Sequence, residues 1–277
     1  MVRPKKSLGQ HFLRDDNIAR KIAGYLNPAY PLVLEVGPGT GALSRHLLHD
    51  DRFETWFMEV DREAATYLRS AFPDIRERLI EADFLKYDLA AFPPEKAIGS
   101  RPNEELPAAQ GPRFSIIGNF PYNISSQILF RVLAFRDRIP ETIGMFQKEL
   151  ADRITAPPGS KTYGILSVLI QSFFETDYLF TVGEQVFSPP PKVKSAVIRL
   201  RRNGVTSLGC DETLFFRVVK TAFNQRRKTL RNALKPLPGS HLLQETPSLV
   251  PLLELRAERL TIDDFIRITR TLQQFIS

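Results

Sequence analysis

The chain has 277 residues, of which 43% are hydrophobic and 25% charged, and its formal net charge is +7. This composition is ample to build a hydrophobic core, and the single cysteine, Cys210, excludes an internal disulfide and a cysteine zinc cluster. The amino-terminal residues lack a signal-peptide pattern, and the longest apolar stretch, around 164–174, is too short and too polar to span a membrane. We therefore expect a cytoplasmic protein without a membrane partner.

Positive charge is concentrated in two segments of the chain. Residues 192–235 contain twelve Lys or Arg against two acidic residues, and the first fourteen residues contain four Lys or Arg and no acid. Basic clusters on an otherwise mildly acidic body are typical of a surface that binds a polyanion. Solvated surface is the alternative, but the clustering favours a nucleic acid as partner.

Between residues 32 and 200, apolar runs typical of strands alternate with amphipathic stretches typical of helices. The expected strands are Leu32–Val36, Thr55–Val60, Leu79–Ala82, Phe114–Gly118, Thr142–Phe146, Tyr178–Val182 and Ala196–Leu200. This alternation predicts an α/β fold with a mostly parallel sheet covered by helices on both faces. The last two strands are joined by a proline-rich segment without a long helix, which predicts that the final strand is antiparallel to its neighbour.

Two of the connections between these strands carry amphipathic stripes that predict helices. The stripes consist of Leu43, Leu47 and Leu48, and of Ile128, Leu129, Val132 and Leu133. A third connection, residues 92–113, contains five prolines and two glycines. This composition predicts an irregular surface excursion before the fourth strand.

After residue 204 the pattern changes to helices alone. Asp211 is placed to cap a helix, and Thr261 is placed to begin another with Asp264 as its capping-box partner. The apolar faces expected for these two helices are Leu214, Phe215, Val218, Val219 and Ala222, and Phe265, Ile268, Leu272 and Phe275. We therefore expect two domains, residues 1–204 with the sheet and residues 205–277 as a small all-helical domain.

Three glycines, Gly37, Gly39 and Gly41, follow the first expected strand and precede a helix. Glycines at this place allow a tight turn and the close approach of a ligand to the backbone. The spacing differs from that of the dinucleotide fingerprint, and no lysine follows as in a triphosphate-binding loop. By itself the segment fits a structural turn nearly as well as a cofactor loop.

Acidic residues end the next two expected strands and strengthen the interpretation as a cofactor site. Glu59 follows Gly37 by twenty-two residues, where an acid accepts hydrogen bonds from ribose hydroxyls in doubly wound sheets. Asp83 ends the third strand, where its carboxylate can accept from an adenine amine while Phe84 packs on the ring. These features predict a crevice for a nucleoside cofactor. S-adenosylmethionine fits it, and NAD remains open on these residues alone.

The four residues after the fourth expected strand, 119–122 (Asn-Phe-Pro-Tyr), suit the binding of a flat nitrogen base. The carboxamide oxygen of Asn119 and the carbonyl of Pro121 can accept both N–H groups of an adenine amine, and Tyr122 offers a stacking face. Phe187, in a proline-rich segment, is the candidate for the opposite face. Methyl transfer to the amine then needs mainly positioning of a base that is flipped out or lies in a loop. An ordinary turn and a core aromatic at Phe187 are the alternatives.

The ordered motifs resemble those of the ribosomal RNA adenine dimethyltransferases, specifically the small-subunit (KsgA-type) branch. The resemblance covers nearly the whole chain and rests on Ser7–Leu13, Glu35–Gly41, Glu59–Asp61, Asp83, Gly118–Ser125, Phe187–Val193 and Asn224–Asn232. It implies a Rossmann-like class I methyltransferase sheet, a small all-helical C-terminal domain and S-adenosylmethionine as cofactor. The implied activity is dimethylation of two adjacent adenosines in a hairpin loop near the 3′ end of small-subunit rRNA, a step in ribosome biogenesis.

The resemblance also implies roles for individual residues. The cofactor contacts that it implies are His11, Leu13, Gly37, Glu59, Asp83 and Asn119, and the residues themselves add Gly39 and Phe84. The catalytic contacts with adenine that it implies are Asn119, Tyr122 and Phe187, and the residues themselves add Pro121. The chain departs from the family pattern at two places, because His11 stands where many members have asparagine and Phe120 where many have leucine. No metal site is expected, because His46 and His49 lack a third ligand.

The basic helix that includes Arg226, Arg227, Lys228 and Arg231 is expected to contact phosphates rather than bases. The expected partner is small-subunit rRNA or the pre-assembled small ribosomal subunit, bound by a monomer. Three alternatives remain. One is the large-subunit branch of the same superfamily, of the antibiotic-resistance type, and another is a non-catalytic RNA-binding assembly factor on the same fold. The third is an NAD oxidoreductase, which the glycine spacing and residues 119–122 disfavour.

Overall fold

The structure is a computed structural model of the chain, and it describes residues 2–94 and 111–276. The central part of the excursion expected at 92–113 therefore lies outside the described residues. The described chain divides into two compact units. The first comprises Met1–Ala151 and Asp177–Arg202, and the second comprises Asp152–Thr176 and Asn203–Ser277.

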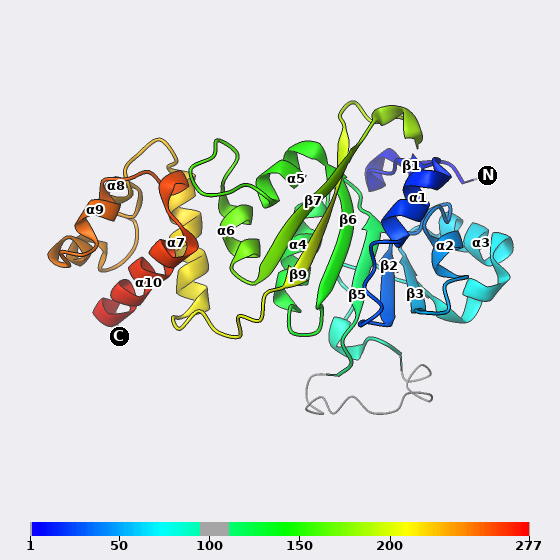
Figure 1. Cartoon of the computed structure of the whole chain (residues 1–277), viewed down its shortest axis with the longest axis horizontal. Helices are drawn as coiled ribbons and strands as arrows, with labels where there is room; N and C mark the ends of the chain where they lie inside the picture. The colour runs from blue at the N-terminus through cyan, green and yellow to red at the C-terminus, as the bar shows by residue number, and fades with distance from the viewer. Residues whose placement is uncertain (1, 95–110, 277) are drawn as a thin grey trace. The chain divides into compact units, whose positions relative to one another are not determined.

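The first unit is built on a sheet of seven strands (Figure 1). In spatial order the strands are β4 (Leu79–Glu81), β3 (Glu54–Glu59), β2 (Leu32–Val36), β5 (Ser115–Asn119), β6 (Glu141–Gln147), β9 (Ser195–Arg202) and β7 (Phe174–Val182). The five strands from β4 to β6 run parallel, and β9 runs antiparallel to β6. The predicted fold class, seven strands and antiparallel final strand are confirmed; the insertion of β9 between β6 and β7 was not predicted.

Helices follow the strands in the chain and cover the sheet, with α1 on the near side and α4 on the far side in Figure 1. The helices that begin in the first unit are α1 (Asp16–Ala23), α2 (Ser44–Leu47), α3 (Arg62–Ala71), α4 (Ser125–Ala134) and α5 (Lys148–Ile154), with 3₁₀ turns η1 (Lys6–Leu8), η2 (Pro73–Arg78), η3 (Leu89–Ala91) and η5 (Glu184–Val186). The predicted stripe of α4 is fully buried, whereas in the α2 stripe Leu48 is only partly buried. All five residues of β2 are buried, as a parallel strand covered on both faces requires.

The order of the strands determines where a ligand can bind. From β2 the chain proceeds through β3 and β4 toward one edge of the sheet, and then returns to pair β5 with the other side of β2. Such a reversal opens a crevice beyond the carboxyl ends of the two central strands. The glycine turn follows β2, and Asn119 ends β5, so both predicted motifs lie at this crevice.

A two-stranded antiparallel ribbon, which the sequence did not predict, joins distant segments next to the crevice. It pairs β1 (Phe12–Leu13) with β8 (Phe187–Ser188), so that Leu13 lies opposite Phe187. The ribbon brings the amino-terminal segment beside the proline-rich segment that follows β8.

The second unit consists of helices around an aromatic core. Its elements are α6 (Ile165–Gln171), α7 (Glu212–Asn224), α8 (Leu230–Ala233), η6 (Ser240–Glu245), α9 (Val250–Leu253), η7 (Ala257–Arg259) and α10 (Ile262–Ile276). Residues 152–176 join it because α6 packs against α7 and the Tyr163 ring lies 6.0 Å from that of Phe223. The expected domain boundary at residue 204 lies close to the point at 202–203 where the chain re-enters the second unit. The expected second domain did not include residues 152–176.

Both predicted caps of the second unit are present. Asp211 accepts from the Leu214 N–H at 2.6 Å, and Thr261 and Asp264 bond each other's backbone N–H groups at 3.0 and 3.2 Å. The predicted apolar faces are buried except at Phe275, which is 37% exposed. Phe275 lies in the last turn of α10, and the expectation that it is buried was wrong.

The glycines of the central strands provide the space for Phe120. The Phe120 ring is fully buried and lies 5.0 Å from that of Phe146, and a Cβ added to Gly144 would overlap both rings. We expect Gly144→Ala to lower the free energy of unfolding by about 1–3 kcal/mol through overpacking. Gly164→Ala is the matched control, because its backbone is extended and its nearest neighbour would lie 3.8 Å away. Urea titration measures both, and equal losses would contradict this account.

Candidate active site

A cavity of about 230 Å³ lies beyond the carboxyl ends of β2, β3, β4 and β5. Its walls come from residues 7–12, from the ends of β2 and β3, from residues 82–85 after β4 and from residues 119–124 after β5. Most of the predicted site residues line it, namely His11, Gly37, Gly39, Glu59, Asp83, Phe84, Asn119, Pro121 and Tyr122. Two predicted residues, Leu13 and Phe187, do not.

The glycine turn is braced by a buried carboxylate. Gly39 has a φ of 58°, and a Cβ there would lie 2.9 Å from the Phe12 ring, so only glycine fits without strain. The Gly39 N–H donates to Glu59 Oε2 at 2.9 Å, and the Asp61 N–H donates to Glu59 Oε1 at 2.9 Å. Burial raises the pKa of Glu59 although these bonds oppose the shift. Glu59 therefore holds the turn in addition to facing the cavity.

Asp83 and Phe84 form the wall beyond β4. Asp83 Oδ1 accepts from the Leu85 N–H at 2.9 Å, which fixes the carboxylate in a local turn. Phe84 is 4% exposed and lies under the guanidinium of Arg131, 6.0 Å from the ring centroid. The arrangement presents an acceptor and an aromatic side chain to the same cavity, as the sequence predicted.

The amide of Asn119 has a fixed orientation. Its Nδ2 donates to the backbone carbonyl of His11 at 2.8 Å. Within the described parts of the chain, no donor bonds its Oδ1, and Asn119 lines the cavity. The amide therefore offers the cavity an acceptor, as predicted.

The structure does not support Pro121 as the second acceptor. Its carbonyl accepts from the Ile124 N–H at 3.2 Å and from Ser125 Oγ at 2.9 Å, so both lone pairs are engaged in the turn that begins α4. By contrast, no donor among the described residues bonds the carbonyl of Phe120, which also lines the cavity. The sequence could not reveal this, because it depends on how the helix begins.

Tyr122 is held by contacts on two sides. Its ring stacks on that of His11, with centroids 5.3 Å apart and planes inclined by 30°, and its hydroxyl lies 2.5 Å from Ser195 Oγ. Burial raises the pKa of Tyr122, so the hydroxyl stays protonated at neutral pH. His11 Nδ1 lies 2.8 Å from the carbonyl of Pro189. The amino-terminal segment, the 119–122 turn and the proline-rich segment are thus joined through these rings.

Phe187, the predicted stacking partner of the target base, does not line the main cavity. Phe187 is 3% exposed and belongs, with Leu13, to the hydrophobic core of the first unit. Leu13 does not line the main cavity; it borders a small cavity next to Gly37 and Asn119 and another next to Asp15 and Thr40. Side chains alternate along a strand, so when Leu13 faces the core its neighbour Phe12 faces the main cavity. This alternation could have identified Phe12 as the cavity residue once β1 was known to be a strand.

Sequence reasoning also missed a buried acid, Glu35, at the end of β2. Glu35 is 1% exposed, and its Oε2 accepts from Ser44 Oγ at 2.8 Å. Burial raises the pKa of Glu35 to about 8; the Ser44 bond opposes this and the charge of Glu59 adds to it. The carboxyl group therefore supports the start of α2 in its neutral form at neutral pH.

Residues 2–94 and 111–276 contain no group of three or more His, Cys, Asp or Glu side chains arranged to hold a metal ion. His46 instead bonds Asp16 Oδ1 through Nε2 at 2.9 Å. None of the helices described here is long and apolar enough to cross a membrane.

The strand order, the glycine turn and the acids that follow successive strands define an α/β enzyme that binds a nucleoside cofactor at the crevice. Comparison with known proteins narrows this class. A family model described as ribosomal RNA adenine dimethylase matches residues 1–274. A curated relative from Cytophaga hutchinsonii, a ribosomal RNA small subunit methyltransferase A, is 49% identical over 273 residues, which cover 98% of each chain.

Solved structures show the same fold. A dimethyladenosine transferase from Plasmodium falciparum is similar with a TM-score of 0.71 at 22% identity, over 93% of this chain and 96% of its own. The 23S rRNA methyltransferase ErmE is similar with a TM-score of 0.66 at 24% identity, over 95% and 99%. The chain belongs to the ribosomal RNA adenine dimethylase family, and the resemblance inferred from its motifs is confirmed.

The raised pKa of Glu35 predicts a pH dependence of stability. The folded-state pKa of about 8 lies above the unfolded value of 4.5, so the contribution of Glu35 to stability is greatest below pH 4.5 and is lost as the pH rises to 8. The slope can reach about 1.4 kcal/mol per pH unit. We expect Glu35→Gln to flatten this dependence, while the exposed control Glu77→Gln retains it. Urea unfolding between pH 5 and 8.5 measures both, and parallel curves for all three proteins would refute the assignment.

Proposed function

We propose that the chain transfers methyl groups from S-adenosylmethionine to the exocyclic amines of two adjacent adenosines in a hairpin loop near the 3′ end of small-subunit rRNA. Membership of the adenine dimethylase family supports the reaction. The name of the relative that is 49% identical supports the small subunit rather than the large one as substrate. The observation that carries the proposal is the fixed amide of Asn119, which presents an acceptor to the cavity beside the glycine turn.

The residues around the cavity fit S-adenosylmethionine. Gly37 and Gly39 leave the backbone accessible, Glu59 offers carboxylate oxygens for ribose hydroxyls, and Asp83 with Phe84 would hold the adenine ring. When bound, the cofactor supplies an electrophilic methyl group on a sulfonium. The acidic walls suit a cationic ligand, and among the described residues no lysine or arginine lines this cavity.

The target adenine would be held by two fixed acceptors. We assign these roles to Asn119 Oδ1 and the carbonyl of Phe120, because the Pro121 carbonyl is engaged in its own turn. Two acceptors on the amine draw its lone pair out of conjugation and aim it into the cavity. The amine needs no strong base while it attacks, since its proton can leave once the methyl group has arrived. We assign the stacking contact with the target adenine to Tyr122. The adenine would lie on the face of the Tyr122 ring that His11 leaves open, or on the other face after His11 moves aside.

The basic surface of the second unit is the proposed contact with RNA phosphates, but its four predicted cations are not equivalent. Arg226 donates to the Lys161 carbonyl at 2.5 Å and lies 3.8 Å from Glu258, and Arg231 is ion-paired with Glu254. Within the part of the chain that the structure describes, the exposed side chains of Arg227 and Lys228 have no such partner. We therefore propose Arg227 and Lys228 as phosphate contacts and Arg226 and Arg231 as residues that hold neighbouring loops. We also propose that the chain acts on the small subunit as a monomer.

The assignment of Asn119 is tested by removing its amide. We expect Asn119→Ala to lower methyl transfer to under-methylated small subunits by about 100-fold or more, as for loss of a preorganised polar contact in a transition state. Asn123→Ala is the matched control, since its amide lies on the same wall but makes only a 3.5 Å contact with the Ser7 carbonyl. We expect a loss below tenfold there. Labelled cofactor and mapping of the modified adenosines provide the measurement; label in large-subunit RNA, or an active Asn119→Ala, would refute the proposal.

The salt dependence of RNA binding separates the two kinds of cation. Each phosphate contact contributes roughly 0.7–0.9 to the slope of log affinity against log salt. We expect Arg227→Gln combined with Lys228→Gln to lower the slope by about 1.4–1.8 without changing stability. The control, Arg226→Gln combined with Arg231→Gln, should leave most of the slope and reduce the unfolding temperature. The reverse pattern would show that paired cations bind the RNA.

A further inference from the structure

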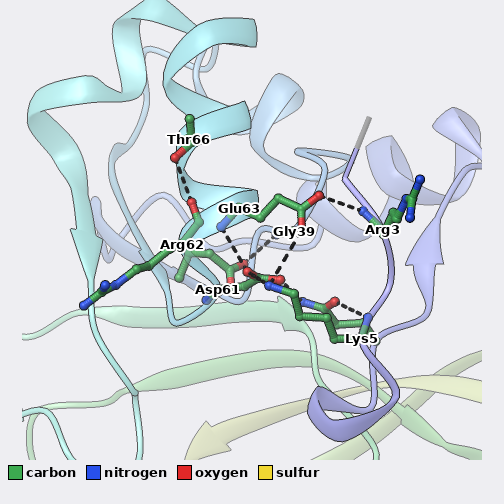
Figure 2. A network of polar contacts seen from close by, with 9 residues as sticks. Arg3, Lys5, Gly39, Asp61, Arg62, Glu63 and Thr66 are labelled. Carbon is green, nitrogen blue, oxygen red and sulfur yellow. Dashed lines mark hydrogen bonds and ion pairs between the residues drawn. The ribbon is translucent and has the colours of Figure 1, made fainter.

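A buried carboxylate, Asp61, lies between the end of β3 and the start of α3 (Figure 2). Its side chain is fully buried, and Oδ1 accepts from the Glu63 N–H at 3.0 Å as the amino-terminal cap of α3. A single backbone bond is little compensation for a fully buried charge. The remaining partners of Asp61 come from more than fifty residues away, in the amino-terminal segment.

Two side chains of that segment converge on Asp61. The ammonium group of Lys5 forms an ion pair with Oδ1, and Gln10 Nε2 donates to Oδ2 at 3.3 Å. Gln10 is itself held by the Lys5 N–H, which donates to its Oε1 at 2.9 Å. Burial alone would raise the pKa of Asp61, but the bonds from Lys5, Glu63 and Gln10 outweigh it and hold the pKa below its usual value. Asp61 is therefore charged at neutral pH and bound to the segment on both oxygens.

The segment attached in this way forms one wall of the cavity. Residues 7–12 line it, between the attachment at Asp61 and a second attachment where Asn119 Nδ2 bonds the His11 carbonyl. Asp61 is also connected to the glycine turn, because Glu59 accepts from the N–H groups of both Asp61 and Gly39. One chain of contacts thus links Lys5, Asp61, Glu59 and the turn.

We propose that Asp61 is a positioning residue that holds residues 5–12 closed over the cofactor cavity through Lys5 and Gln10. Release of the Lys5 ion pair frees this strap, so that the cofactor enters and leaves while the residues that contact it stay in place. The inference rests on the proposed cofactor site, but the closed strap itself is a property of the protein without cofactor.

Two substitutions in the same segment separate the ion pair from general charge. Lys5→Met removes the ammonium group and keeps the aliphatic stem. Arg3→Met is the matched control, because in the described chain its guanidinium has no partner and only its backbone N–H is used, donating to Glu63 Oε1 at 3.3 Å. We expect Lys5→Met to raise the cofactor dissociation rate at least fivefold and KM for the cofactor to a similar extent, with kcat at saturating cofactor within twofold. Arg3→Met should leave the dissociation rate and KM within twofold of wild type.

A third variant tests whether Lys5 acts through Asp61. Asparagine caps helices as well as aspartate does, so Asp61→Asn should retain α3. We expect the double variant Lys5→Met/Asp61→Asn to release cofactor within twofold of Lys5→Met alone. If the rate increase in the double variant equalled the product of the increases in Lys5→Met and in Asp61→Asn, the two residues would act independently and the proposal would be overturned.

Hydrogen exchange of the cofactor-free protein keeps this test separate from the proposed function. We expect the amides of residues 7–12 to exchange at least fivefold faster in Lys5→Met than in wild type and Arg3→Met, whereas those of β2 and β5 are unchanged. Equal exchange in the three proteins would refute the strap. Faster exchange together with no binding of S-adenosylmethionine by wild type would refute the proposed function and leave the strap standing.

Discussion

The arrangement of the active site depends on one constraint, the divergence of the chain on either side of β2. Because β3 and β5 pair with opposite edges of this strand, the turns that follow β2 and β5 face each other across a crevice that no strand fills. The glycine turn and Asn119 are brought together by this geometry alone, although they lie about eighty residues apart in the chain. The chemistry proposed for the cavity therefore follows from topology before any side chain is considered.

Buried carboxylates then set the positions of the backbone around the crevice. Glu59 ties the turn to the end of β3, and Glu35 supports the start of α2. Asp61 is different, because its charge is stabilised by side chains from the amino-terminal segment rather than by its own neighbours. Of the three acids, Asp61 is the one that connects the end of β3 to the amino-terminal segment, residues 5–12. This segment is not part of the seven-stranded sheet.

The strands, the two caps and most of the cavity residues could be predicted because they depend on local patterns. Apolar runs and N-cap residues act through neighbours in sequence, and acids at strand ends are positioned by the strands themselves. The remaining expectations depend on how distant segments pack and on how a helix begins. Phe187 and Leu13 turn inward because β1 pairs with β8, and the Pro121 carbonyl is lost to the start of α4. Charge counting does not reveal that Arg231 is ion-paired with Glu254, which follows it by twenty-three residues.

These differences indicate which parts of the site are rigid. The walls after β2, β3, β4 and β5 begin at sheet hydrogen bonds and are held by local turns. The wall formed by residues 7–12 is held by side-chain contacts at Asp61 and Asn119 and by the two-residue pairing of β1 with β8. Lys5, whose ion pair with Asp61 attaches this wall, is partly exposed to solvent, and ion pairs of exposed side chains are weak. A ligand that must enter a cavity whose other walls are rigid passes through the wall formed by residues 7–12, because that wall has the weakest attachment.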